Sequence, residues 1–238
     1  FATQFAARGW TVIATTRRPA EATALNALAK ARPNVTVEPL DITSADSVAA
    51  LAARYRDRRI DVLVNNAALL ERPAAQQFGQ LDFALFEKSF AVNATGPIRV
   101  TQAFADNVAR SRRKTVFTLS SAAASVQLVS APAVYYEYRA SKAALNMLMH
   151  NLAIDLKPRG ITVLIVNPGL VDTRGIMNRK PGDPIPEEFA PVMPAIESGQ
   201  LKLMTTTESV PGMLALLDRA TPEPSGQFVN FDGTPLPW

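Results

Sequence analysis

Short apolar runs alternate along the chain with longer stretches whose apolar positions recur at helical spacing. The short runs are rich in β-branched residues, which is typical of strands that are buried on both faces. Strands are predicted over residues 11–15, 35–40, 60–64, 115–119, 161–166 and 227–231. Helices are predicted over residues 20–31, 44–58 (capped by Thr43 or Ser44), 81–112, 136–157 and 207–219. Strands separated by helices predict an α/β fold, a doubly wound parallel sheet with helices on both faces.

One segment departs from this alternation. Residues 181–194 contain five prolines, which disfavours a long helix there. The segment follows the carboxyl end of a strand, where open α/β sheets bind ligands. We interpret it as a loop that covers the substrate, in preference to an inert surface excursion. Nothing else divides the chain, so residues 1–238 are expected to form a single domain.

Composition excludes several classes of protein. The net charge is only +4, and the densest basic run, residues 110–114, falls at an expected helix end, where cations are solvated and favourable. Nucleic acid is therefore not an expected partner. The chain has no cysteine, and its single histidine, His150, has no second ligand nearby, so no metal site is predicted. No apolar stretch is long enough for a membrane span and no signal peptide is visible, which makes the cytoplasm the default compartment.

The strongest chemical signal is a tyrosine four residues before a lysine, Tyr138 and Lys142. Residues at this spacing share a helix face, so the phenol and the ammonium can converge on one substrate atom. A nearby cation stabilises a phenolate and makes proton exchange with a carbonyl oxygen feasible. Tyr135 and Tyr136 have no lysine at this spacing. Taken alone, the pair is a weak signal, and a surface tyrosine beside a solvated lysine is the favoured interpretation; the surrounding motifs change this.

Further motifs surround this pair in a fixed order. They are Asn65-Asn66-Ala67-Ala68, Asn93 in a helix, Leu119-Ser120-Ser121, the run from Tyr138 to Met147, and Asn167-Pro168-Gly169-Leu170-Val171-Asp172-Thr173. With them, nearly the whole chain resembles the short-chain dehydrogenase/reductase family, closest to its C-factor and sniffer-like carbonyl reductases. The resemblance implies a Rossmann-like fold.

The resemblance also implies catalytic roles. Tyr138 would donate a proton to the substrate oxygen as hydride arrives from a nicotinamide, and Lys142 would bind the nicotinamide ribose and lower the tyrosine pKa. Ser121 would orient the carbonyl, and Asn93 would hold a water of the proton relay. The spacing to Tyr138 is longer than is common in the family, which leaves Ser125 as the alternative serine.

Cofactor contacts are implied in the same way. Asn65 and Ala67 would line the adenosine side, Asp41 and Ile42 would face the adenine, and Pro168, Gly169, Val171 and Thr173 would hold the nicotinamide carboxamide. Ala68 replaces the family's glycine. The first strand ends at Arg17 without an acidic residue, and arginine suits a 2′-phosphate. NADP(H) is therefore expected rather than NAD(H).

The family's first strand and its glycine-rich phosphate loop are absent from this chain. Residues 1–10 look like the latter part of the helix that follows that loop. Loss of a central strand would expose two sheet edges, so we expect that preceding residues are omitted rather than that the strand is truly lacking.

The predicted function is NADP(H)-dependent reduction of a small carbonyl compound, or oxidation of the corresponding alcohol. The alternative is a catalytically silent nucleotide-binding or cell-signalling protein on the same fold. The apolar circumference of residues 143–156 indicates burial on more than one side, and the family resemblance implies that this helix is paired in a homodimer or homotetramer. Residues 126–134 and 181–194 should line the substrate pocket, and neither identifies the substrate.

Overall fold

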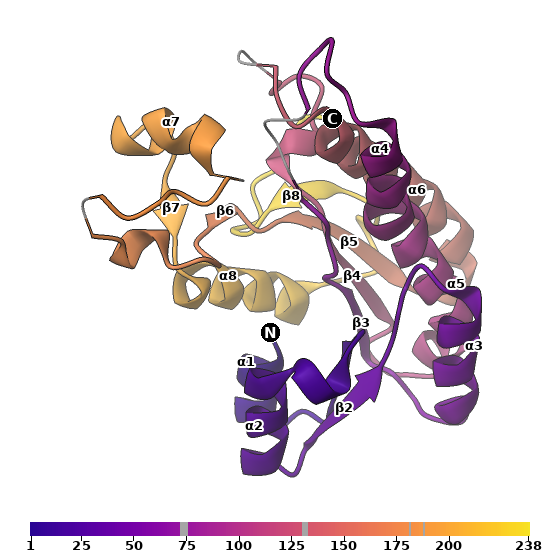
Figure 1. The fold of residues 1–238 in the computed structure, drawn as a ribbon. Coiled ribbons are helices and arrows are strands. Elements are labelled where there is room, and N and C mark those ends of the chain that lie inside the picture. Colours follow the sequence, from indigo (N-terminus) through magenta and orange to yellow (C-terminus); the bar gives the residue numbers. More distant parts are fainter. Residues whose placement is uncertain (72–75, 130–132, 181, 188) are drawn as a thin grey trace.

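The computed structural model describes residues 1–71, 76–129, 133–180, 182–187 and 189–238 (Figure 1). Its helices are α1 (Ala2–Ala7), α2 (Thr23–Ala31), α3 (Ala45–Arg54), α4 (Phe83–Phe90), α5 (Gly96–Ala109), α6 (Tyr136–Leu156), α7 (Met193–Glu197) and α8 (Thr206–Arg219). Its strands are β1 (Val12–Thr16), β2 (Val35–Pro39), β3 (Val62–Asn65), β4 (Thr115–Leu119), β5 (Thr162–Asn167), β6 (Leu170–Val171), β7 (Leu203–Met204) and β8 (Phe228–Asn230). Strands and helices alternate as the apolar pattern predicts.

The strands form parallel sheets. The largest has the order β3-β4-β5-β8, with Phe117 of β4 opposite Val64 and Leu164. Strands β1 and β2 form a second parallel pair, and β6 and β7 a third. Figure 1 shows α3, α5 and α6 on one side of the large sheet and α8 on the other. The predicted α/β fold with helices on both faces is confirmed.

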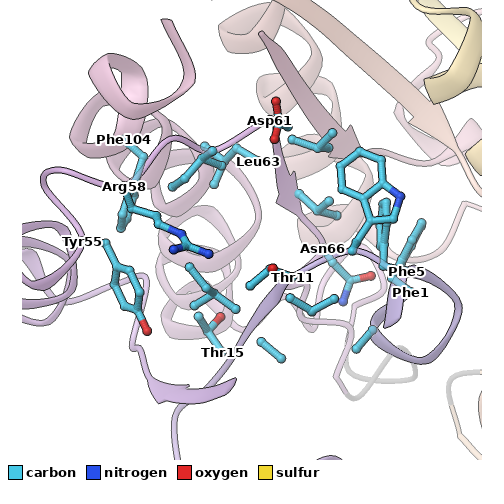
Figure 2. A pocket seen from close by; sticks show the side chains of 18 of the residues that line it. Phe1, Phe5, Thr11, Thr15, Tyr55, Arg58, Asp61, Leu63, Asn66 and Phe104 are labelled. Atoms are coloured by element: carbon cyan, nitrogen blue, oxygen red, sulfur yellow. The ribbon is translucent and has the colours of Figure 1, made fainter. Parts of the chain in front are cut away.

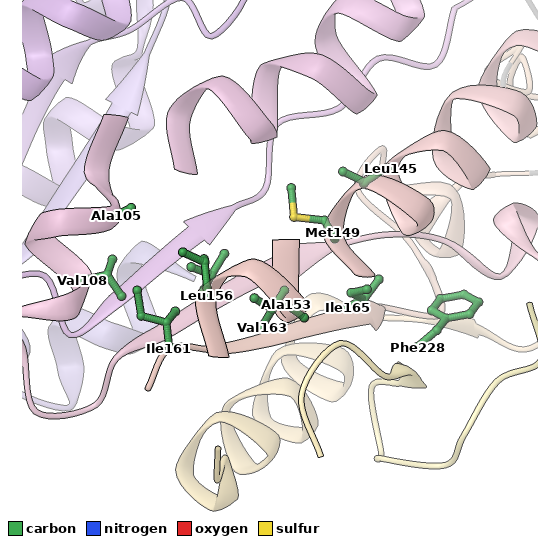
Figure 3. Close-up of a cluster of buried hydrophobic side chains, with 11 residues drawn as sticks. Ala105, Val108, Leu145, Met149, Ala153, Leu156, Ile161, Val163, Ile165 and Phe228 are labelled. Atoms are coloured by element: carbon green, nitrogen blue, oxygen red, sulfur yellow. The ribbon is translucent and has the colours of Figure 1, made fainter. Parts of the chain in front are cut away.

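The main core lies between the large sheet and helices α5 and α6 (Figure 3). Successive residues of β4 point to opposite faces: Val116 packs under α5 and α6, whereas Phe117 packs with α1 and α8. Strand β5 alternates in the same way, with Val163 and Ile165 on the first side and Val166 on the second. Because both faces are covered, neither strand shows the alternation of buried apolar and exposed polar residues that a half-exposed strand has.

A cavity of about 1140 Å³ separates the two larger sheets (Figure 2). Among the described strands, β1 pairs with β2 alone and β3 pairs with β4 alone. Residues of both strands line the cavity, as do Phe1 and Phe5 of the N-terminal segment. One edge of β1 and one edge of β3 therefore have no partner among the described strands.

Two predicted helices were too long. The helix expected over residues 81–112 is divided into α4, a π-helical turn (Ala91–Thr95) and α5. Pro97 explains the interruption, because it has no N–H to donate within the helix. The helix expected over residues 44–58 is capped by Ser44, as predicted, but ends at Arg54. The segment after this helix is held by Asn107 of α5, whose side-chain amide donates to the carbonyl oxygens of Tyr55 and Arg58, each at 2.7 Å.

The segment after β5 is more ordered than the proline content suggests. Strands β6 and β7 and the short helix α7 form there, and none of them was predicted. Parts of the two proposed pocket segments, residues 130–132, 181 and 188, lie outside the described residues. The proposal that residues 181–194 cover a substrate stays a prediction.

Candidate active site

Helix α6 places Tyr138 and Lys142 one turn apart at the carboxyl end of the large sheet. The Lys142 Nζ lies 5.9 Å from the centroid of the Tyr138 ring. The lysine is 2% exposed and donates a 2.9 Å hydrogen bond to the carbonyl oxygen of Leu119, the last residue of β4. An ammonium has three donors, so this bond fixes Lys142 beside the tyrosine while two donors remain.

Ser121 lies beside Tyr138, and Ser125 is engaged elsewhere. Ser121 caps the short 3-10 turn (Ala122–Ala124) that follows β4, and its hydroxyl is hydrogen-bonded with the Tyr138 side chain. The Ser125 hydroxyl is fully buried and donates to the carbonyl oxygen of Trp238 at 3.2 Å. The structure thus brings Ser121, and not its competitor, to the tyrosine.

The pKa of Tyr138 differs in direction from the sequence-based expectation. Burial raises the pKa of the phenol above its usual value of 10, the Ser121 hydrogen bond lowers it, and Glu137 raises it further, so the net direction is upward. Burial also lowers the pKa of Lys142 to about 8. The predicted lowering of the Tyr138 pKa by Lys142 was wrong in direction, because desolvation is the largest cause of the shift and Lys142 is not among its causes.

Two asparagines connect the large sheet to its helices. Asn65, at the end of β3, donates to Thr101 at 3.0 Å and to Thr118 at 3.2 Å. Asn93 lies in the π-helical turn, donates to the Leu69 carbonyl oxygen and the Ser141 hydroxyl, and accepts from the Leu69 N–H at 2.6 Å. Its side-chain amide therefore ties the segment after β3 to α6.

The expected adenosine contacts gather at the ends of β1 and β2. Asp41 accepts hydrogen bonds from the side chain and backbone of Thr43, which lower its pKa, and nearby Arg17 and Arg99 lower it further. Arg99 also donates to the Ile42 carbonyl oxygen at 2.7 Å. Ile42, Asn65 and Ala67 line the cavity between the sheets. Arg17 is exposed, as a phosphate contact must be.

The turn after β5 is held by both of its flanks. Ser209 of α8 donates to the Pro168 carbonyl oxygen at 2.6 Å. Gly169 has φ +79°, and a Cβ there would lie 2.3 Å from the end of Met204, so the position requires glycine. Val171 pairs with Met204, and Thr173 is exposed just beyond.

Several features of this site were not predicted. The π-helical turn at Asn93 had one signal, the Gly96-Pro97 pair in a helical run. Arg99 reads in sequence as an ordinary surface residue of a helix. Glu137, fully buried with no hydrogen-bond partner for either carboxylate oxygen in the described structure, gives no signal beyond a charge among aromatic residues.

The described residues contain no group of three or more His, Cys, Asp or Glu side chains that could hold a metal ion. No helix in the described ranges is both long and apolar enough to cross a bilayer.

Comparison with known proteins shows the family. The sequence model of the short chain dehydrogenase family matches residues 1–183 of this chain. The C-signal protein of Myxococcus xanthus is 33% identical over 179 residues, which cover 75% of this chain and 93% of the relative. The chain therefore belongs to the short-chain dehydrogenase family, as its motifs predicted.

Solved structures agree with this assignment. An NADPH-bound carbonyl reductase from chicken fatty liver is 27% identical, with a TM-score of 0.79, 96% of this chain and 88% of that chain covered. A short-chain dehydrogenase/reductase from Burkholderia multivorans with bound NADP is 28% identical, with a TM-score of 0.80, 100% and 92% covered. These similarities confirm the predicted fold class.

Proposed function

We propose that this protein is an NADP(H)-dependent oxidoreductase that reduces a small carbonyl compound or oxidises the corresponding alcohol. The observation that carries the proposal is the meeting of Ser121, Tyr138 and Lys142 at the carboxyl end of the large sheet. A hydroxyl, a phenol and an amine within reach of one oxygen atom suit proton transfer to a developing alkoxide.

In the proposed reaction, bound NADPH supplies the hydride. Ser121 donates a hydrogen bond to the substrate oxygen and orients the carbonyl. Tyr138 gives its proton to that oxygen as negative charge develops. Because the pKa of Lys142 is about 8, the amine can hold a proton near neutral pH and return one toward Tyr138. Asn93 keeps α6 and the segment after β3 in register.

The described residues fit the two ends of the proposed cofactor. Arg17 is exposed, follows the end of β1 and lies near Asp41. Strand β1 itself contains no Asp or Glu. A guanidinium in this place favours a 2′-phosphate, so we propose NADP(H) over NAD(H). Lys142, Tyr138 and the turn containing Pro168, Gly169, Val171 and Thr173 would face the nicotinamide end. The NADPH- and NADP-bound relatives support this assignment.

A titration of NADPH fluorescence with the purified protein tests the proposal, followed by a panel of aldehydes and ketones. Saturable binding and NADPH oxidation that depends on the carbonyl compound are expected. Absence of NADPH binding would remove the enzymatic proposal.

A second candidate is a protein that binds the nucleotide without turnover. The similarity to C-signal is compatible with a signalling role. This candidate predicts NADPH binding with no reduction of any carbonyl on the panel. The intact set of Ser121, Tyr138, Lys142 and Asn93 favours the enzyme.

We further propose that residues 1–238 act as one domain in the cytoplasm and assemble as a homodimer or homotetramer. Met147 and Ile154, two turns apart on α6, are 63% and 61% exposed. A partner protomer would bury them. Sedimentation should give a dimer or tetramer that dissociates in the double variant Met147→Glu/Ile154→Glu, and a monomeric wild type would refute the assembly. Cell fractionation tests the compartment.

A further inference from the structure

The segment that follows the turn at Pro168 folds back on its own small core. Ile176, Phe189 and Met193 are each 7% exposed and pack together. The pairing of β6 with β7 closes the base of this segment, with Leu170 opposite Leu203. We call residues 173–203 the flap, of which 181 and 188 are not described. Thr173 is its first residue.

A single side chain organises the entry to the flap. One carboxylate oxygen of Asp172 accepts hydrogen bonds from the backbone N–H groups of Arg174 at 3.1 Å and Ile176 at 2.9 Å. The other oxygen accepts from the N–H of Met177 at 2.8 Å. The N–H of Asp172 itself donates to the Met204 carbonyl oxygen at 2.7 Å. Asp172 therefore bonds to the start of the flap through its carboxylate and to Met204, just after the flap, through its backbone N–H.

The electrostatics agree with this arrangement. Burial raises the pKa of Asp172, but the backbone N–H groups of Met177, Ile176, Arg174 and Gly175 outweigh it and the net direction is downward. Gly175 has φ +77°, which lets the chain curl around the carboxylate. A carboxylate that accepts several backbone N–H groups is one of the stronger hydrogen-bonding arrangements in proteins.

The backbone of Thr173 is enclosed by these bonds. It lies between the residue that provides the carboxylate and the first residue that donates to it. Its neighbour Val171 is fixed in the pair with Met204. The backbone mobility of Thr173 therefore depends on whether the Asp172 carboxylate keeps its hydrogen bonds.

We propose that Asp172 is a positioning residue, whose carboxylate fixes the backbone of Thr173 and couples it to the flap. The consequence for cofactor binding rests on the proposed function, because Thr173 would meet the nicotinamide carboxamide. Asp172 itself contacts neither cofactor nor substrate in this proposal. Its removal should weaken NADPH binding without slowing the proton transfer made by Tyr138.

Amide hydrogen exchange tests the proposal without any cofactor. In Asp172→Ala, exchange at residues 174, 176 and 177 should accelerate roughly tenfold or more, while β4 and β5 keep wild-type rates. Asp172→Asn retains one acceptor oxygen, so its exchange should fall between the two. The matched control is Asp183→Ala, which removes a flap carboxylate that accepts the Lys180 N–H and should leave residues 174–177 unchanged. Wild-type exchange at 174–177 in Asp172→Ala would overturn the proposal.

Kinetics supply the second readout. Asp172→Ala should raise the KM for NADPH about tenfold and change kcat less than about threefold, with partial rescue in Asp172→Asn. Faster exchange with an unchanged KM would refute the coupling to Thr173. If the wild-type protein binds no NADPH, the proposed function fails, and the exchange experiment still decides on Asp172.

Discussion

The two larger sheets of this protein differ in how completely they are buried. In the four-stranded sheet, Val116, Val163 and Ile165 are fully buried under α5 and α6. In the sheet formed by β1 and β2, no residue of β1 is buried, and one edge of that strand faces the cavity. The proposed catalytic groups lie at the first sheet, whereas Arg17 and Asp41, two of the proposed contacts to the adenosine half of the cofactor, follow the strands of the second.

This difference separates two requirements of a dinucleotide enzyme. Ser121, Tyr138 and Lys142 are held by packed strands and a long helix, so their geometry does not depend on β1 and β2. Arg17 and Asp41 follow β1 and β2, which pair only with each other among the described strands. Changes in the first region should affect chemistry and folding, whereas changes in the second should affect mainly nucleotide affinity.

The largest expected effect is on the proposed chemistry beside the four-stranded sheet. Tyr138→Phe removes the proton donor and should lower kcat by roughly a thousandfold, with the KM for NADPH nearly unchanged. Steady-state NADPH oxidation measures this. Tyr136→Phe, which removes a hydroxyl two residues away on α6, should keep wild-type kcat. Equal activity of both variants would show that the chemistry lies elsewhere.

Matched core substitutions test the difference in burial. Ile165→Ala removes a fully buried side chain and should cost about 2–5 kcal/mol of unfolding free energy. Ile13→Ala in β1 removes a partly exposed side chain beside the cavity and should cost less than about 1 kcal/mol. Urea unfolding of both variants gives the comparison. If Ile165→Ala does not fold, the pair Ile165→Val and Ile13→Val keeps the same order with smaller costs. Equal losses of unfolding free energy in the two variants would contradict the difference in burial between the two sheets.

Lys142 is expected to be required for activity while lowering the free energy of unfolding. Its pKa falls from 10.5 to about 8 on folding because burial disfavours the ammonium, a difference that corresponds to roughly 3 kcal/mol. Between these two values the unfolded chain binds the proton and the native protein does not, so wild-type stability rises with pH there. Below pH 8 the buried charge costs its full amount.

The variant Lys142→Met should therefore be inactive, yet more stable than wild type at pH 7. Its advantage should shrink as the pH rises from 8 toward 10.5. The lost hydrogen bond to Leu119 reduces the gain by about 1 kcal/mol. Urea unfolding at pH 7 and pH 9.5 measures both effects, and an advantage that does not change with pH would rule out the buried charge as its cause.

Much of the fold could be predicted from the sequence. The β-branched runs of β4 and β5 are long and bounded by turns, so strand type and parallel arrangement followed from burial on both faces. The interruption of the long helix at Asn93 could not be predicted in detail, because the break depends on how Pro97 and neighbouring carbonyl groups pack. Strands β6 and β7 have two residues each, and such short pairing leaves no periodic signal.

The candidate site divides in the same way. Motif order predicted Tyr138, Lys142 and Ser121, and the structure brings them together. Whether Ser121 or Ser125 meets the tyrosine could not be decided from spacing, since the answer depends on Trp238, which is distant in sequence and binds Ser125. The predicted direction of the Tyr138 pKa shift was wrong, because a sequence shows the neighbouring lysine but not the desolvation of the two groups.

The smallest expected effect concerns the two-stranded sheet, where Arg17 and Arg18 form a matched pair. The Arg18 guanidinium is bonded to Glu21 at 3.1 Å, whereas Arg17 lies near Asp41 at the proposed phosphate position. Arg17→Ala should raise the Kd for NADPH about tenfold, because a charged hydrogen-bonding contact to the 2′-phosphate is lost. NADH, which has no such phosphate, should bind the variant and the wild type equally, and kcat should be unchanged. Fluorescence titration with both nucleotides measures this, with Arg18→Ala as the control expected to match wild type. An equal loss of NADPH and NADH affinity in Arg17→Ala would mean that the arginine supports β1 rather than reading the phosphate, and that the two sheets are less independent than their burial indicates.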